Sequence, residues 1–210
     1  MKPIAKGKSN RLSMRCAAMT RLVIFDVDGV LIDSFRAWYE ASRAGYESCG
    51  MSLSEKDFRE RCWGVPFPVE FRRHVSDEEK VRKASNAVKG AFASNASRIA
   101  VFKDTIPTIS KLRSKGIKIG ILSNTPKHII APVLGAKGIP YDFMVTPPDV
   151  RPKPDAEGIL ALCRMAGVGK DEAVYVGDTK TDEQTGENAG VRTFIVGKHF
   201  PGIGGLLKRI

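Results

Sequence analysis

Residues 21–34 read RLVIFDVDGVLIDS, and this stretch decides the fold. Its first part, residues 21–25, is short and largely apolar and ends at Asp26, which is typical of a strand buried on both faces of a parallel sheet. Alternation along an extended chain places Asp26 and Asp28 on the same side, and Gly29 permits a tight turn after them. The stretch therefore predicts a buried strand that brings two carboxylates to one edge of a sheet.

Four further apolar runs of strand length follow, at residues 117–122, 141–145, 173–176 and 193–196. Helix-like stretches precede the first of these runs and separate the four, at residues 107–115, 126–136, 155–166 and 181–189. Strands that alternate with helices of about ten residues are typical of βαβ units and a parallel sheet. The sequence therefore predicts an α/β fold with a Rossmann-like three-layer core around a central parallel sheet.

Residues 34–100 interrupt this alternation and read as helical throughout. Ser76 with Glu79 has the spacing of a capping box, and Ser52 with Glu55 has the same spacing. The aromatic residues of this stretch are expected to form a small core of its own: Trp38, Tyr39 and Tyr46. We predict an inserted helical cap domain at 34–100, a catalytic core at 21–33 and 101–210, and a tail at 1–20.

The charge is uneven along the chain. Of 34 basic and 23 acidic residues, which give a net charge of +11, five bases and no acid lie in residues 1–20. We expect this basic tail to be disordered, although the composition of an organellar transit peptide is similar. The rest of the chain is only mildly basic, so we do not expect a nucleic-acid partner.

Composition also indicates the cellular compartment in which we expect the protein. The four cysteines are scattered, without the close spacing of zinc sites or disulfide frameworks, and no run approaches the ~20 apolar residues that cross a membrane. We therefore expect reduced thiols, no membrane association and a cytoplasmic protein.

Four clusters of polar residues lie between a predicted strand and the helix that comes after it. This is the edge at which open parallel sheets bind ligands. They begin at Asp26, Ser123, Arg151 and Gly177 and read DVDGVLIDS, SN, RPKPD and GDTKTD. The first offers two carboxylates, the second a hydroxyl and backbone N–H groups suited to phosphate oxygens, the third a cation and the fourth two more carboxylates. Carboxylates held this close together need a cation, and Mg²⁺ suits a site made only of oxygen atoms.

In this order the four clusters resemble those of the haloacid dehalogenase-like superfamily, in its phosphoglycolate phosphatase-like branch with a helical cap, over about residues 20–200. The resemblance implies that Asp26 is the nucleophile and Asp28 the general acid and base. It also implies a metal site for Mg²⁺ and a phosphate site. The metal site comprises Asp26, Asp28 through its carbonyl, Asp178 and a supporting Asp182, and the phosphate site comprises Ser123, Asn124 and Gly29.

The cation of the third cluster has two candidates. Read as KPDAEG, the cluster matches the family pattern with Lys153, and residues 157–160 then fall in register as well. Read as RPKPD, it assigns the same position to Arg151. We favour Lys153, and Arg151 stays open as the alternative.

The function that the resemblance implies is Mg²⁺-dependent hydrolysis of a small-molecule phosphomonoester, phosphoglycolate-like or a sugar phosphate, through a phospho-aspartate, by a monomer or homodimer. A sugar phosphomutase of the same family is the first alternative. Such mutases resemble this chain but carry an arginine in the cap loop, where this sequence has Phe67 after Gly64. A non-catalytic basic module that binds nucleic acid is the second alternative, which only the net charge supports.

Overall fold

A five-stranded parallel sheet forms the centre of the protein. The computed structural model describes residues 19–210, so most of the tail predicted at 1–20 lies outside the described residues. The strands are β1 (Leu22–Phe25), β4 (Lys118–Leu122), β5 (Phe143–Val145), β6 (Ala173–Gly177) and β7 (Arg192–Ile195), in the order β5-β4-β1-β6-β7. All neighbouring pairs are parallel, which confirms the predicted α/β fold.

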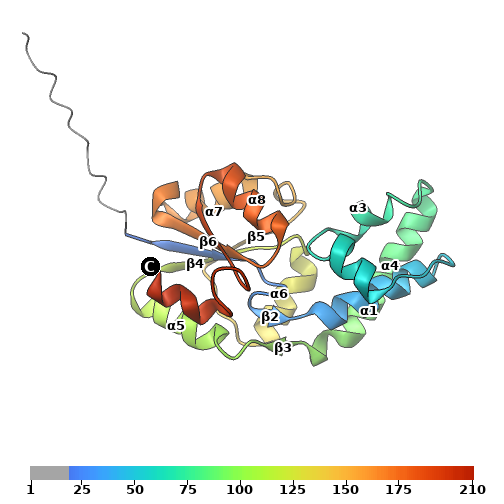
Figure 1. The fold of residues 1–210 in the computed structure, drawn as a ribbon, viewed down its shortest axis with the longest axis horizontal. Helices are drawn as coiled ribbons and strands as arrows, with labels where there is room; N and C mark the ends of the chain where they lie inside the picture. The colour runs from blue at the N-terminus through green and yellow to red at the C-terminus, as the bar shows by residue number, and fades with distance from the viewer. Residues whose placement is uncertain (1–18) are drawn as a thin grey trace, which may run out of the picture.

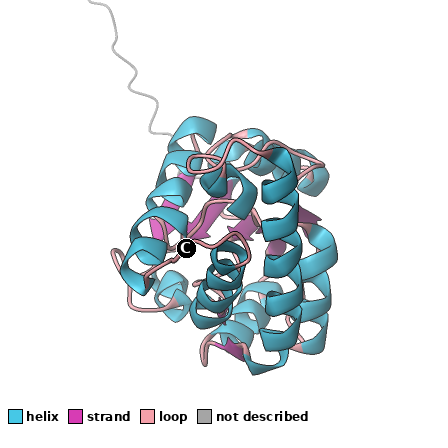
Figure 2. Ribbon diagram, turned by 90° about the vertical axis from the view of Figure 1, so that its right-hand side faces the viewer, coloured by secondary structure: helices cyan, strands magenta, loops and turns pink. Residues whose placement is uncertain are grey.

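Helices cover both faces of this sheet (Figures 1 and 2). Apolar side chains of α5 (Thr105–Ser114), α6 (Lys127–Ala136) and the 3₁₀ segment η4 (Ile203–Lys208) pack on one face. Those of α7 (Glu157–Ala166) and α8 (Lys180–Ala189) pack on the other, and the short 3₁₀ segment η3 (Lys170–Glu172) leads into β6. β1 is wholly buried at the centre of the three layers. Asp26, which follows β1 directly, therefore lies at the middle of one edge of the sheet.

Residues 34–100 form a group of helices beside the sheet, which we call the helical region (Figure 1). It contains α1 (Phe35–Glu47), α2 (Glu55–Asp57), the π-helical segment η1 (Phe58–Cys62), α3 (Phe67–Phe71), α4 (Glu78–Asn95) and the 3₁₀ segment η2 (Ala96–Arg98). At its base the two connecting segments pair as an antiparallel sheet, β2 (Ile32–Asp33) with β3 (Ala100–Val101). The chain therefore enters and leaves the helical region through one narrow stem.

The N-cap residues predicted for the two capping boxes, Ser76 and Ser52, were wrong. Helix α4 begins after Asp77, whose carboxylate accepts the N–H groups of Glu79 and Lys80 at 2.9 and 3.3 Å, so Ser76 lies outside the helix. Likewise α2 begins after Ser54, not Ser52. Asp and Ser are about equally good N-caps, so a sequence with adjacent candidates does not select between them.

The expectation of helix throughout 34–100 also needs correction, because a π-helical segment and several loops separate the helices. Tyr39 and Tyr46 do lie in a buried cluster of the helical region, as expected. Among the described residues, no helix combines the length and the apolar character that a membrane crossing requires.

Candidate active site

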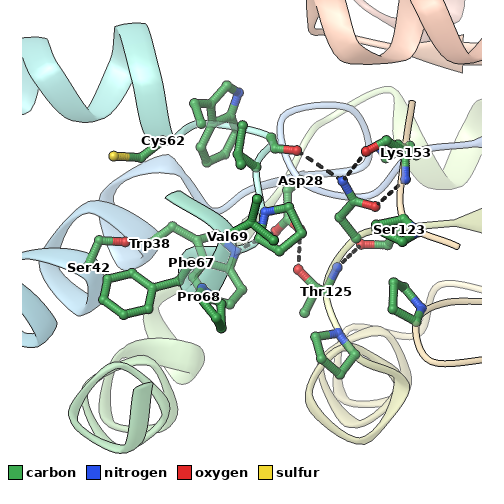
Figure 3. A pocket seen from close by; sticks show the side chains of 18 of the residues that line it. Asp28, Trp38, Ser42, Cys62, Phe67, Pro68, Val69, Ser123, Thr125 and Lys153 are labelled. Atoms are coloured by element: carbon green, nitrogen blue, oxygen red, sulfur yellow. Dashed lines mark hydrogen bonds between the residues drawn. The ribbon is translucent and has the colours of Figure 1, made fainter. Parts of the chain in front are cut away.

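The carboxyl ends of β1, β4 and β6 meet at one cavity of about 350 Å³, which Figure 3 shows from close by. Asp26 and Asp28 follow β1, Ser123 and Asn124 follow β4, and Asp178 follows β6; all five line this cavity. Lys153 reaches it from the loop before α7, and the helical region closes the opposite side. The parallel sheet thus assembles residues that lie more than 150 positions apart in the sequence.

Lys153 joins two buried carboxylates. Its Nζ lies 2.9 Å from Asp26 Oδ1 and 2.6 Å from Asp182 Oδ1, and its side chain is only 3% exposed. Three ionisable groups this deep in the protein are tolerated because each has an opposite charge in contact. The chain of contacts fixes the position of the Asp26 carboxylate from one side.

Asp182 is saturated with hydrogen-bond donors. Its Oδ1 accepts from Lys153 and from Tyr175 Oη at 2.5 Å, while its Oδ2 accepts from the backbone N–H and hydroxyl of Thr179 at 3.0 and 2.5 Å. A carboxylate has about four lone-pair sites, so these donors occupy them. Asp182 therefore acts in this geometry as the anchor of Lys153, although one oxygen of each of the carboxylates of Asp26, Asp178 and Asp182 lies within 4.8 Å of the other two.

The protonation of these groups follows from their surroundings. Burial raises the pKa of Asp26 well above its usual range, and the charge of Lys153 only partly offsets this. Burial also opposes ionisation of Asp182, but Lys153 and the hydrogen bonds lower its pKa below the ordinary value. Burial alone would lower the pKa of Lys153, but the two carboxylates raise it above its ordinary value, so this side chain is a permanent cation.

The Asp28 carboxylate is held by three donors. Ser34 Oγ and Trp38 Nε1 donate to its Oδ1 at 2.6 and 2.9 Å, and Thr125 Oγ1 donates to its Oδ2 at 3.1 Å. Trp38 packs against the buried cluster of the helical region, as expected, and its ring stacks on Phe92, but its indole N–H also reaches the active site. Asp28 is partly exposed to the cavity, in contrast to Asp26.

The two carboxylate oxygens of Asp178 differ in their hydrogen bonding. Trp63 Nε1 donates to its Oδ2 at 2.9 Å, whereas its buried Oδ1 has no hydrogen-bond partner among the described residues. Burial raises the pKa of Asp178 to about 6 despite the Trp63 hydrogen bond. The Asp178 carboxylate with this unpartnered oxygen lies close to the Asp26 carboxylate, and together they form a set of oxygen ligands that fits a hard cation such as Mg²⁺.

The three residues expected to bind phosphate lie differently. Ser123 is buried in the cavity wall, where its Oγ accepts the N–H of Thr125 at 3.0 Å. The Asn124 side chain links the two halves of the site, since it accepts from Lys153 N at 2.8 Å and donates to Gly64 O at 3.1 Å. The N–H of Gly29 donates to Ile32 O at 2.9 Å within the turn, so a phosphate contact by Gly29 stays a prediction.

The alternative cation of the third cluster points away from the site. Arg151 is 71% exposed and pairs with Asp155 at 2.9 Å and Glu157 at 3.0 Å on the surface. Between the two candidates, Lys153 is the one in contact with Asp26.

Several residues at the site were not predicted from the sequence: Trp38, Trp63, Thr125, Tyr175 and Thr179. Thr125 and Thr179 lie next to predicted site residues, so their hydroxyls were available as a local signal. The tryptophans lie in the helical region, and the sequence contains nothing that indicates which aromatic ring reaches which carboxylate.

Gly29 offers a first test of this geometry. Its φ of +79° favours glycine, and a Cβ at this position would overlap Asp178 Oδ2. We expect Gly29→Ala to lower the free energy of unfolding by more than the ~1–2 kcal/mol that a left-handed conformation costs an L-residue. Gly50→Ala is the matched control, because Gly50 has a φ of +75° and no atom lies within 4 Å of the place that the alanine methyl would take. Urea denaturation that shows equal losses for both variants would contradict the close packing of Gly29 on Asp178.

Comparison with known proteins places this geometry in a family. The sequence pattern of the haloacid dehalogenase-like hydrolases matches residues 23–196. Phosphoglycolate phosphatase 1 of Pseudomonas aeruginosa is 27% identical over 185 residues, which cover 83% of this chain and 68% of that protein. The phosphoglycolate phosphatase of Pseudomonas putida is also 27% identical, with the same shares covered.

Solved structures show the same fold. CbbY from Rhodobacter sphaeroides, determined in complex with phosphate, has a TM-score of 0.73 and 19% identity, covering 84% of this chain and 86% of that one. Because the family pattern spans most of the chain, from β1 to the end of β7, the resemblance seen in the sequence is confirmed. The chain belongs to the haloacid dehalogenase-like hydrolase family and is a phosphatase that resembles its phosphoglycolate phosphatase-like branch.

Proposed function

We propose that this protein is a Mg²⁺-dependent phosphatase that hydrolyses a small-molecule phosphomonoester through a phospho-aspartate on Asp26. One observation carries the proposal: Asp26 is buried at the cavity with its Oδ1 held 2.9 Å from Lys153 Nζ, and Asp28 lines the same cavity two residues later. A fixed carboxylate nucleophile and a neighbouring acid and base are the two groups that this reaction needs.

In the first step an oxygen of Asp26 attacks phosphorus in line with the ester oxygen. The bond between phosphorus and the ester oxygen breaks, and Asp28 gives its proton to the leaving alcohol. Lys153 stabilises the charge on the transferring phosphoryl group, because its ammonium already lies at the nucleophilic carboxylate. The products of this step are the free alcohol and an acyl phosphate on Asp26.

In the second step Asp28, now ionised, takes a proton from a water molecule that attacks the acyl phosphate. This releases inorganic phosphate and regenerates the Asp26 carboxylate. The three donors on the Asp28 carboxylate, Ser34, Trp38 and Thr125, hold it in one orientation through both proton transfers. Acid and base help of this kind contributes ~10²–10⁴-fold to a rate.

The metal site that we propose consists of the carboxylates of Asp26 and Asp178 and the main-chain carbonyl of Asp28, with Asp182 in support. The unpartnered Oδ1 of Asp178 supports this assignment. When bound, Mg²⁺ would offset the repulsion between these carboxylates and the phosphate dianion. Asp182 supports the site through Lys153 and the Thr179 turn, which it holds in place.

We also propose that the helical region is a cap over the active site. Three of its contacts support this: Trp63 with Asp178, Trp38 with Asp28 and the Gly64 carbonyl with Asn124. A cap of this kind excludes water from the reacting atoms and contributes part of the substrate pocket. The stem formed by β2 and β3 is the segment about which it would move.

Hydrolysis is favoured over the mutase alternative by the composition of the cavity wall. Phe67 contributes an apolar ring to this wall, and no arginine of the described residues lines the cavity. Lys89 is the one cation of the described helical region that does, and it is exposed. A mutase must hold a sugar bisphosphate at both of its phosphate groups, which requires a second cationic site opposite the nucleophile.

The metal requirement is a direct test of the proposal. We expect phosphate release from phosphomonoesters to fall at least about 100-fold after exhaustive chelation and to return with Mg²⁺, because a bound cation would stabilise the charge on the transferring phosphoryl group by several kcal/mol. Ca²⁺ should restore little activity, since its longer and looser coordination misaligns the in-line attack. Full activity in a protein shown by elemental analysis to be free of metal would contradict the proposal.

A further inference from the structure

The outer part of the cavity is lined by apolar side chains of the helical region. We call this part the outer pocket and define it by six residues: Trp38, Trp63, Val65, Phe67, Val69 and Val88. In Figure 3 Trp38 and Phe67 lie on one side of the cavity, opposite Ser123, Thr125 and Lys153 of the core. The group that leaves with the ester oxygen must therefore lie against an apolar wall.

The polar atoms of this wall are largely occupied within the protein. The indole N–H groups of Trp38 and Trp63 donate to Asp28 and Asp178, at 2.9 Å each. The Ser85 hydroxyl donates to Val81 O at 2.7 Å. What remains for a ligand is mainly ring faces and aliphatic surface, together with the hydroxyl of the buried Ser42, which also lines the cavity.

Cationic side chains of the helical region are also directed elsewhere. Arg72 binds Glu78, and both Arg73 and His74 contact the buried carboxylate of Glu70. Of the charged side chains described between residues 34 and 100, only Lys89 lines the cavity, and Lys89 is exposed. A second carboxylate on the substrate would thus lose its water without gaining a buried cation.

Resting on the proposed function, we infer that the substrate is a phosphomonoester whose alcohol is compact and apolar, an aromatic or branched aliphatic group. A sugar or a glycolate would place hydroxyl or carboxylate groups against the outer pocket, where their hydrogen bonds to water are not replaced. This class differs from the phosphoglycolate-like or sugar phosphate expected from the resemblance.

The cavity volume limits the size of this alcohol. The cavity of about 350 Å³ also holds the phosphoryl group beside Asp26. A cavity of roughly 150 Å³ accommodates benzene. One ring, or a branched chain of similar volume, therefore fits the outer pocket together with the phosphate.

The test compares four esters whose leaving groups are all primary alcohols, so that their intrinsic reactivity is similar. We expect kcat/KM for benzyl phosphate and isobutyl phosphate to exceed the values for phosphoglycolate and glucose 6-phosphate at least about tenfold, the scale on which apolar pockets discriminate. Equal or higher values for phosphoglycolate or glucose 6-phosphate would overturn the inference and leave the proposed function standing.

Binding is measured separately, in the Asp26→Asn variant with the same four esters. The sequence contains two tryptophans, Trp38 and Trp63, and both line the cavity, so intrinsic fluorescence reports its occupancy. Benzyl phosphate should bind at least about tenfold more tightly than phosphoglycolate. If none of the esters is hydrolysed, the proposed function fails, and this titration still decides the inference: weaker or equal binding of benzyl phosphate overturns it.

A charge placed in the wall provides the variant test. Val69 lines the cavity and is 46% exposed, so Val69→Asp should fold, and we expect it to weaken benzyl phosphate binding about tenfold or more. Met165→Asp is the matched control, since Met165 is 50% exposed on α7, does not line the cavity, and should leave binding unchanged. Unchanged benzyl phosphate affinity in Val69→Asp would place the ligand outside this pocket and overturn the inference.

Discussion

Replacing Asp26 with asparagine is expected to lower the rate of phosphate release on the order of 10⁴–10⁶-fold, the loss seen when an enzyme loses its nucleophile. An amide oxygen cannot form the acyl phosphate, so the residual rate would come from the remaining groups of the site. The fold should survive, because asparagine has the same shape and the buried position already disfavours the charged form of Asp26. Initial rates with Mg²⁺ and a reactive phosphomonoester measure the effect.

Asp149→Asn is the control for this substitution. Asp149 is exposed and does not line the cavity, so the same chemical change there should leave the rate within a factor of two. Circular dichroism of both variants separates loss of chemistry from loss of structure. Turnover by Asp26→Asn at a rate near that of the unaltered protein would exclude Asp26 as the nucleophile.

The second large effect concerns stability. Lys153→Met should lower the free energy of unfolding by about 3–5 kcal/mol, because it leaves the carboxylates of Asp26 and Asp182 buried without their shared cation. Removing one partner of a buried ionic group is costly even where the intact group adds little net stability. Urea denaturation in the presence of a chelator measures this loss without compensation by a bound metal.

Arg151→Met is the matched control and also decides between the two cations that the sequence left open. Because the Arg151 side chain is 71% exposed and its ion pairs are at the surface, where solvent screens them, we expect the free energy of unfolding to stay close to that of the unaltered protein. Activity should follow the same order, with a large loss only for Lys153→Met. Equal losses of stability and activity in the two variants would contradict the central position assigned to Lys153.

The core of the fold was predictable from the sequence for a simple reason. Buried parallel strands are continuous apolar runs, and the run before Asp26 appears as β1 at the centre of the sheet, with every residue buried. Since parallel strands end at one edge, the polar residues after each run were expected to meet, and Asp26, Ser123 and Asp178 do line one cavity. The prediction of this part of the site depends only on the apolar runs in the sequence and on the topology of a parallel sheet.

The links between these residues were not predictable in the same way. The letters RPKPD alone do not state whether Arg151 or Lys153 turns inward, and the register of residues 157–160 favoured Lys153 without indicating its contacts. In the structure Lys153 contacts Asp182 through its ammonium and Asn124 through its backbone N–H. Tyr175 lies within the apolar run at residues 173–176, yet its hydroxyl donates to Asp182. Such contacts are set by side-chain directions in three dimensions.

The helical region was the least predictable part. Two of its helices begin after Ser54 and Asp77, each one or two residues from the expected cap, because neighbouring polar residues cap equally well. The contacts of Trp38 and Trp63 with Asp28 and Asp178 depend on how the whole region packs over the sheet. A helical period indicates which face of a helix is apolar, but it does not indicate what that face covers.

The central claim is that phosphate is transferred to Asp26. The measurement that tests it most directly is a rapid acid quench during turnover of a phosphomonoester with Mg²⁺, followed by mass spectrometry of the peptide that contains residues 21–34. We predict a phosphate group on Asp26 that hydroxylamine removes, as expected for an acyl phosphate. We predict no phosphate on Asp28 and none on this peptide in the Asp26→Asn variant. Turnover with no phosphorylated peptide at any quench time, or phosphate on Asp28 instead, would contradict the mechanism.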